Sequence, residues 1–346
     1  MVPGRWTGQT TDYPLIIGAA AVRIAMPTDI PGIHHVTAIA GDPGRNLTFY
    51  TETLGLRLVK RSVNQDDVSV YHLFYGDRQG SPGTSMTFFP YGDARPGRVG
   101  TGQVETTQFL VPAESIDFWV ERLDAAGVTV EEPVDRAGER VLPFADPDGL
   151  SLELVGVADP PAGDPPDGTV ASEHAIRGFY GVTLRVGDPR GTASLLEAMG
   201  FEEAEEDGTG SAPPDGSRRR FVADGELASV VDLIVDPDGE RGLPGAGTVH
   251  HVAFQVTAEE QEAWRQLLID RGLRPTEIID RKWFESVYVR TPGGVLFEFA
   301  TKSPGYTVDE DLEDLGESLM LPGWLEDRRE DIESSLPELD VRIGAE

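Results

Sequence analysis

A strand–helix–strand pattern that recurs along the chain is the strongest constraint on its fold. Two stretches, "VTAIAGDPGRNLTFYTETLGLRLV" and "VTLRVGDPRGTASLLEAMGFEEA", each read as a strand, a Gly-Asp-Pro turn, an amphipathic helix and a further strand. Gly55 and Gly200 stand where a helix commonly ends in a left-handed residue. Two further helices, at 115–128 and 259–273, are also followed by strands of alternating hydrophobicity. The chain therefore repeats one small unit four times.

Each repeat predicts a βαβββ module. The expected fold class is α+β, with four modules forming two cupped, barrel-like mixed sheets. In the last part of the chain, leucines and a tryptophan are spaced as the packed side of solvated helices: Leu312, Leu315, Leu319 and Trp324. The expected division is a loose N-terminal extension at 1–25, modules at 31–92, 102–156, 177–236 and 247–301, and an acidic helical C-terminal tail at 302–346.

Composition excludes several classes of function. The 60 acidic residues outnumber the 29 basic ones, giving a net charge of −31, and this field repels nucleic acid and anionic membrane surfaces. The chain has no cysteine, which excludes disulfides, thiolate metal ligands and a cysteine nucleophile. The apolar run at 14–26 contains Arg23 and is shorter than the roughly 20 residues of a membrane span. We expect a cytoplasmic protein that binds neither nucleic acid nor membranes.

Two strands, "GIHHVTAIA" and "TVHHVAFQV", each contain a His-His pair. Because side chains alternate across a strand, neighbouring histidines should point to opposite faces. Alternation predicts that His250 lies on the apolar face beneath a helix and that His251 lies on the concave, more polar face. The same argument places His35 and Thr37 together. In "GVLFEFAT", alternation puts Glu298 on the opposite face of the strand from its aromatic neighbours. A buried carboxylate is costly unless it is paired or binds a metal.

Equivalent positions can be compared across the four modules. The first-strand position holds His35, roughly Thr106, Gly181 and His251, and the last-strand position holds an apolar residue near Phe88, Glu153, Asp232 and Glu298. If modules one and four face each other, their cup receives two imidazoles and one carboxylate, a set that suits Fe(II) and leaves positions open. A hydrogen-bonded core group is the alternative for any one of them. Their matching positions favour a metal-bearing barrel from modules one and four, and a metal-free one from modules two and three.

These motifs, together with "YHLFYGDRQGSPGTSMTFFP" and "DRKWFESVYVRTPGGVLFEFAT", resemble the vicinal-oxygen-chelate (glyoxalase, bleomycin resistance and extradiol dioxygenase) superfamily. Within it they are similar to ring-cleaving dioxygenases that act on hydroquinones and related diphenols. The similarity covers residues 30 to about 330. The resemblance implies a metal held by His35, His251 and Glu298. It further implies that five residues surround the metal and take part in the chemistry: His34, Thr37, His250, Arg281 and Tyr288.

The resemblance implies an extradiol-type dioxygenase that uses Fe(II), or alternatively Mn(II), to insert O2 into a hydroquinone or catechol. His250 would exchange protons, while Arg281 and Tyr288 would position a second substrate oxygen or a developing anion. We expect His72 to line the cavity or the core, and Glu153 to be hydrogen-bonded or at a rim. A glyoxalase-like isomerase or lyase, which usually has four metal ligands, and a non-catalytic small-molecule-binding resistance protein are the alternatives. A homodimer is compatible with each.

The charge balance also predicts a response to salt. Only three lysines accompany the acidic surface, a composition typical of halophilic proteins that work in molar salt, where a Debye length of about 3 Å screens self-repulsion. We expect the melting temperature to rise between dilute buffer and molar KCl, as followed by circular dichroism. An unchanged melting temperature would identify an ordinary acidic protein.

Overall fold

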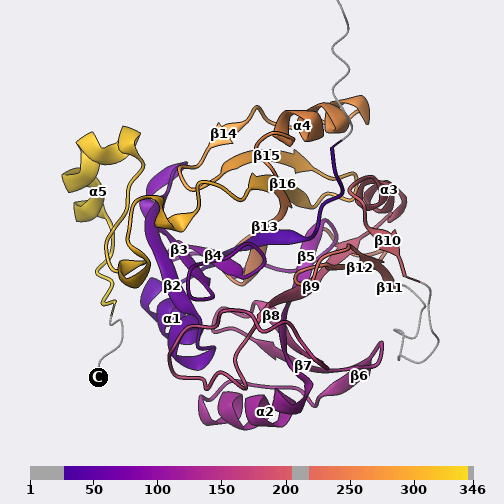
Figure 1. Ribbon diagram of the computed structural model, residues 1–346, viewed down its shortest axis with the longest axis horizontal. Coiled ribbons are helices and arrows are strands. Elements are labelled where there is room, and N and C mark those ends of the chain that lie inside the picture. The colour runs from indigo at the N-terminus through magenta and orange to yellow at the C-terminus, as the bar shows by residue number, and fades with distance from the viewer. Residues whose placement is uncertain (1–26, 205–217, 342–346) are drawn as a thin grey trace, which may run out of the picture.

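The computed structural model describes residues 27–204 and 218–341, so the expected N-terminal extension lies outside the described residues. Two curled sheets, each covered by short helices, form an α+β architecture, which confirms the predicted fold class (Figure 1). Each of the four repeats contributes a strand, a helix and three more strands. The local periodicity of the sequence therefore indicated the correct elements.

The first sheet combines strands from the two ends of the chain. In spatial order it contains β14 (Ile279–Asp280), β15 (Glu285–Arg290), β16 (Leu296–Thr301), β13 (Thr248–Val256), β1 (Ile33–Ala40), β4 (Ser85–Pro90), β3 (Asp67–Gly76) and β2 (Arg57–Asn64). At its centre β1 and β13 are antiparallel, and each is parallel to the last strand of its own repeat, β4 or β16. The first and fourth repeats thus share one continuous sheet.

The second sheet has the same arrangement and is built from the middle of the chain. It contains β10 (Glu202–Glu203), β11 (Arg218–Val222), β12 (Val230–Val235), β9 (Gly178–Val186), β5 (Gln103–Pro112), β8 (Ser151–Val157), β7 (Glu139–Ala145) and β6 (Val134–Arg136). Its central strands β5 and β9 are antiparallel. The two sheets contact each other through β13 and β5, and the two linkers between them are bridged at Arg98 and Leu243.

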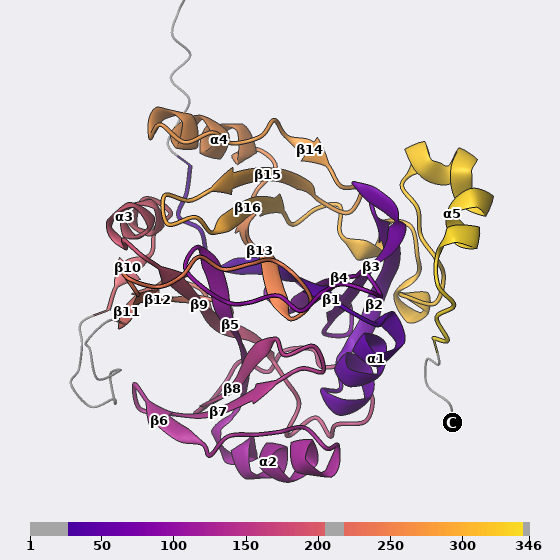
Figure 2. The same cartoon turned by 180° about the vertical axis from the view of Figure 1, so that it is seen from behind.

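One helix follows the first strand of each repeat and packs on its sheet. These helices are α1 (Pro43–Thr48, continued by a π-helical turn at Phe49–Thr53), α2 (Ile116–Ala125), α3 (Arg190–Ala198) and α4 (Gln261–Asp270). Figure 2 shows α2 and α4 at opposite ends of the molecule. Trp119 of α2 and Trp264 of α4 are buried, and the Trp264 ring lies 5.5 Å from Phe299 of β16. Within the described ranges, no helix is long and apolar enough to span a membrane.

The C-terminal tail packs beside β2 and β3, where α5 is seen in both views (Figures 1 and 2). Up to residue 341 it contains three 3-10 segments and one helix: Tyr306–Val308, Leu312–Asp314, Gly323–Arg328 and α5 (Arg329–Ser335). The backbone N–H of Met320 donates to the carbonyl of Arg61 at 2.9 Å, so the tail covers part of a sheet edge. Leu315 is buried as expected, whereas Trp324 is 54% exposed and lies outside the core.

Two of the three lysines attach the tail to the first sheet. Lys60 of β2 is fully buried, and its Nζ pairs with Asp309 at 2.8 Å and with Glu310. Lys282 Nζ pairs with the second oxygen of Asp309 at 2.5 Å. The indole N–H of Trp283 donates to the same carboxylate at 3.2 Å. One tail carboxylate therefore fixes the loop that follows β14.

Candidate active site

A cavity of about 430 Å³ lies in the first sheet and is lined by residues of the first and fourth repeats. Its walls are largely aromatic, and the rings include those of Phe74, Phe89, Trp283, Phe284 and Tyr288. Polar side chains reach the same space from β2, β3, β13 and the loop after β14: Asn64, Gln65, His72, His250 and Arg281. An apolar cavity with a few convergent polar groups is suited to binding a small organic molecule.

His35 and His251 line this cavity, and the fully buried Glu298 contacts both of them. His251 Nε2 lies 2.8 Å and His35 Nε2 lies 3.3 Å from the same oxygen, Glu298 Oε2. The two Nε2 atoms are 3.4 Å apart. All three side chains are buried, and no other cluster in the described part of the chain brings three potential metal ligands this close. The geometry therefore provides three ligand atoms around one point.

A local two-fold axis between β1 and β13 generates the two histidine positions. His35 on β1 lies opposite Ala253 on β13, and Thr37 on β1 lies opposite His251. A half-turn that exchanges the strands therefore relates His35 to His251. On the outer sides, Ala253 pairs with Glu298 of β16, so the same half-turn predicts a counterpart of Glu298 on β4.

That counterpart is Thr87, because Thr87 pairs with Thr37 as Glu298 pairs with Ala253. Comparison of the repeats predicted an apolar residue near Phe88 at this position, which is wrong by one residue: Phe88 points to the opposite face and is buried in the core. Thr87 Oγ1 lies 2.8 Å from Thr37 Oγ1 and 3.0 Å from His72 Nε2. The Thr87 hydroxyl, which is engaged in these two contacts, therefore occupies the position at which a carboxylate could have served as a fourth metal ligand.

Each ligand histidine is oriented by the histidine that precedes it. His35 Nδ1 lies 2.9 Å from His34 Nδ1, and His251 Nδ1 lies 2.7 Å from His250 Nδ1. Desolvation by the surrounding protein is the main cause that lowers the pKa of His34 to about 3 and that of the more exposed His250 to about 4, so both are neutral near pH 7 and can accept a hydrogen bond. A proton on Nδ1 of His35 and His251 leaves each Nε2 free, which is the tautomer that binds a metal.

Two β-bulges produce the close histidine pairs. The extra residue is His34 on β1 and His250 on β13, because the pairing register shifts by one at each point. A bulge leaves its residue unpaired and redirects the side chain. Strict alternation predicted His250 beneath a helix, which is wrong: its side chain is exposed, lines the cavity and lies 5.8 Å from the Phe89 ring.

Glu298 carries the buried charge of the site. Its Oε1 accepts a hydrogen bond from Ser286 Oγ, whereas Oε2 accepts none of good geometry from any residue in the described ranges. Burial by itself raises the pKa of Glu298, whereas protons on the facing nitrogens of His35 and His251 would outweigh this effect and hold the pKa well below its usual range. A cation held between the three side chains would act in the same direction. A buried carboxylate oxygen without a donor, facing two imidazole nitrogens in the ligating tautomer, fits a divalent metal ion.

Of the other predicted site residues, some line the cavity and others are buried behind the histidine ligands. Arg281 and Tyr288 line the cavity, with the guanidinium 5.4 Å over the Tyr288 ring and 3.2 Å from Asp66. Burial is the main cause that raises the pKa of Tyr288, which therefore keeps its proton. His34 and Thr37 are buried behind the ligands and do not belong to the cavity wall. Thr87 was not predicted from the sequence, because only the pairing register between β1 and β4 identifies its position.

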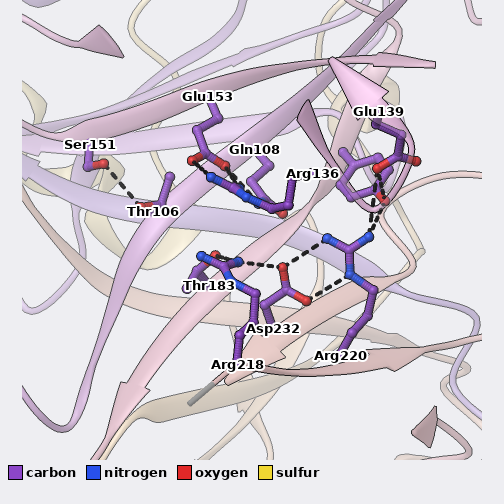
Figure 3. A network of polar contacts seen from close by, with 11 residues as sticks. Thr106, Gln108, Arg136, Glu139, Ser151, Glu153, Thr183, Arg218, Arg220 and Asp232 are labelled. Carbon is purple, nitrogen blue, oxygen red and sulfur yellow. Dashed lines mark hydrogen bonds and ion pairs between the residues drawn. The ribbon is translucent and has the colours of Figure 1, made fainter. Parts of the chain in front are cut away.

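The concave face of the second sheet holds an arginine–carboxylate network (Figure 3). Both terminal nitrogens of Arg136 contact Glu153, at 2.8 and 2.9 Å. Asp232 lies between Arg218 and Arg220, with contacts of 2.7 to 3.1 Å. Glu153 is thus hydrogen-bonded as expected. These acids occupy the strand positions that Glu298 and Thr87 hold in the first sheet.

Histidine has no room at the equivalent first-strand position of this second network. Gly181 stands where His251 stands in the first sheet, and a Cβ on Gly181 would lie 2.1 Å from the carbonyl oxygen of Val230. At the position that corresponds to His35, Thr106 Oγ1 lies 3.0 Å from Ser151 Oγ. Guanidinium groups therefore neutralise the acids here, and no imidazole approaches them.

Comparisons with known proteins define the class. Residues 32–154 and 178–299 match the sequence profile of the Glyoxalase/Bleomycin resistance protein/Dioxygenase superfamily, and the chain belongs to this superfamily. A Bacillus subtilis protein provisionally named ring-cleaving dioxygenase MhqE is 44% identical over 311 residues, covering 89% of this chain and 99% of that protein. The chlorohydroquinone/hydroquinone 1,2-dioxygenase of Sphingobium indicum is 34% identical over 317 residues, covering 89% and 96%.

A solved structure shows the same architecture. The crystal structure of a Bacillus subtilis protein, provisionally named a dioxygenase, superposes with a TM-score of 0.85 at 41% identity, covering 91% of this chain and 99% of that one. The resemblance inferred from the histidine motifs is therefore confirmed, and the relatives bear names of ring-cleaving and hydroquinone dioxygenases.

The arginine network of the second sheet predicts an asymmetric response to mutation. Arg136→Ala leaves Glu153, which is 8% exposed, without its cationic partner, and should lower the free energy of unfolding by about 3 kcal/mol. Replacing both residues, as Arg136→Met with Glu153→Leu, should restore most of it. Arg190→Ala, which breaks an exposed ion pair, is the matched control and should change nothing measurable. Urea denaturation measures all three, and equal losses in the single and double variants would contradict this account.

Proposed function

We propose that the protein is an Fe(II)-dependent dioxygenase that cleaves a dihydroxylated aromatic ring of the hydroquinone type. The observation that carries the proposal is the ligand set, in which two imidazoles and Glu298 face one point and the two-fold counterpart of Glu298 is a hydroxyl, Thr87. Such a 2-His-1-carboxylate set leaves adjacent positions open for substrate and dioxygen. The names of the relatives support the same reaction.

In this proposal His35 and His251 hold the ion through Nε2, and Glu298 holds it through Oε2. Bound Fe(II) supplies a positive charge that lowers the pKa of a phenol and a redox centre that activates dioxygen. Mn(II) accepts the same ligands and is the alternative metal. Both atoms of O2 enter the product, and the ring carbon–carbon bond next to a hydroxyl-bearing carbon breaks.

The protein's own side chains bind the ring and handle protons. The rings of Phe74, Phe89 and Phe284 line the cavity and exclude water from the aromatic substrate. His250 is neutral and reaches the cavity, and because its Nδ1 accepts a hydrogen bond from His251, its Nε2 carries the proton that it can exchange with a substrate oxygen. Arg281 and protonated Tyr288 both donate hydrogen bonds, and they position a second substrate oxygen or a developing anion.

The alternative on this scaffold is a glyoxalase-like isomerase. Thr87 argues against an isomerase, because an isomerase site should have a fourth metal ligand at the position that Thr87 occupies. A non-catalytic binding protein needs no buried ligand triad, so the three converging ligands also speak against that function.

Oxygen uptake tests the proposed reaction. Protein loaded anaerobically with Fe(II) in molar KCl should consume O2 stoichiometrically with hydroquinone, and Glu298→Ala should abolish the uptake by removing the carboxylate ligand. Thr87→Glu, which supplies a fourth ligand, should retain iron and lose uptake. Asp188→Asn, in an exposed ion pair, is the control and should behave as wild type. No uptake with any diphenol at one iron per chain would refute the dioxygenase and favour the isomerase.

The proton and anion roles are tested separately. His250→Ala and Tyr288→Phe should each lower kcat by about 100-fold, since each removes a group that moves or stabilises charge in the transition state. Steady-state rates must be compared at equal iron content, measured for each variant. Wild-type turnover in both variants with iron fully bound would show that these two residues have other roles.

A further inference from the structure

His72 of β3 lies in the cavity but is not part of the ligand set. Its imidazole packs against two aromatic rings, with centroids 3.8 Å from Phe74 and 4.4 Å from Phe89. Its Nε2 lies 3.0 Å from Thr87 Oγ1, which lies 2.8 Å from Thr37 Oγ1. Packing and this chain of contacts together fix the orientation of the ring.

The other ring nitrogen of His72 is available to a ligand. Nδ1 has no hydrogen-bond partner among residues 27–204 and 218–341, yet it is not enclosed by protein atoms, and His72 lines the cavity. Burial is the main cause that holds the pKa of His72 well below its usual range, and the nearby His35 and His251 add to this effect. The cavity therefore contains one uncharged nitrogen with an open hydrogen-bonding position.

The contact chain behind His72 can run in either direction. If Thr37 donates to Thr87 and Thr87 donates to Nε2, then Nδ1 carries the proton and donates into the cavity. If Nε2 donates to Thr87 and Thr87 donates to Thr37, Nδ1 accepts instead. A hydroxyl group both donates and accepts, so it is matched to either state. Arg281, by contrast, can only donate.

The two-fold axis shows what His72 replaces. Phe74 pairs with Thr87 as Tyr288 pairs with Glu298, so His72 on β3 corresponds to Ser286 on β15. Ser286 donates to Glu298 and so orients a metal ligand, whereas His72 contacts Thr87, which is not a ligand. The fourth repeat thus supplies the carboxylate ligand of the site, while the equivalent place in the first repeat leaves a polar nitrogen facing the substrate space.

We propose that His72 is a substrate-binding residue whose Nδ1 recognises the diphenol hydroxyl that is not bound to the metal. Thr87 and Thr37 are positioning residues that act through His72. The inference rests on the proposed function and assigns a residue to the recognition of the distant hydroxyl of a para-diphenol. The two adjacent oxygens of a catechol can both occupy open metal positions, whereas the distant hydroxyl of a hydroquinone needs a partner from the protein. Arg281 and Tyr288 are then left to stabilise the developing anion.

Binding measurements under anaerobic conditions test this role without turnover. Calorimetry on the Fe(II)-loaded protein would compare hydroquinone with p-cresol, in which a methyl group replaces the distant hydroxyl. His72→Phe should reduce the preference for hydroquinone by about tenfold, the worth of one buried hydrogen bond. Thr87→Val should reduce it less, and Thr87→Ser should preserve it. Phe89→Leu, which changes the cavity wall but not the hydroxyl chain, should weaken both ligands alike.

A spectroscopic readout separates recognition from general structural damage. In the diamagnetic Zn(II)-loaded protein, imidazole ¹⁵N shifts report which ring nitrogen carries the proton, and the His72 signal is the one lost in His72→Phe. Hydroquinone should shift that signal, and p-cresol should leave it in place. An unmoved signal, or an unchanged preference in His72→Phe while the wild-type protein turns hydroquinone over, would overturn this inference alone. Absence of oxygen uptake by wild type would instead overturn the proposed function.

Discussion

The antiparallel pairing of β1 with β13 is the interaction on which the site depends. It joins the first and last repeats into one sheet and brings His35 and His251 within 3.4 Å. Because side chains alternate along a strand, a slip of one residue would move a histidine to the other face and separate the ligands. The bulges at His34 and His250 belong to the same register and place a second imidazole in contact with each candidate ligand. Backbone pairing thus positions both the candidate ligands and the histidines that contact them.

The two sheets show two ways of accommodating a carboxylate at the same buried strand position. Glu298 faces two imidazoles and is compatible with a cation between them, whereas Glu153 and Asp232 are neutralised by guanidinium groups. Both solutions offset the desolvation of a buried charge. They differ in consequence, since a guanidinium fills the space permanently and a metal site keeps open positions. Gly181 excludes a side chain, so the second sheet cannot build the first arrangement.

Local periodicity explains which features the sequence predicts. Alternation and helical spacing are properties of neighbouring residues, so the repeats and the concave placement of His35, His251 and Glu298 follow from them. The bulge at His250 depends on the pairing of β13 with β1, which are more than two hundred residues apart in the sequence. The position of Thr87 depends on the register of β4 on β1. No local sequence pattern encodes either pairing. The attachment of the tail through Asp309 likewise depends on contacts between segments of the assembled chain.

The order in which the ligands are synthesised has a consequence for a growing chain. His35 emerges from the ribosome long before His251 and Glu298, while the second sheet is built from one contiguous stretch and can form in between. Asp309, which secures the loop bearing Trp283, is made later still. A chain that ends before the fourth repeat therefore contains only His35 of the three candidate metal ligands. If the site binds iron as proposed, the ion can be held there only after the fourth repeat has been made, so metal binding would follow the completion of the first sheet.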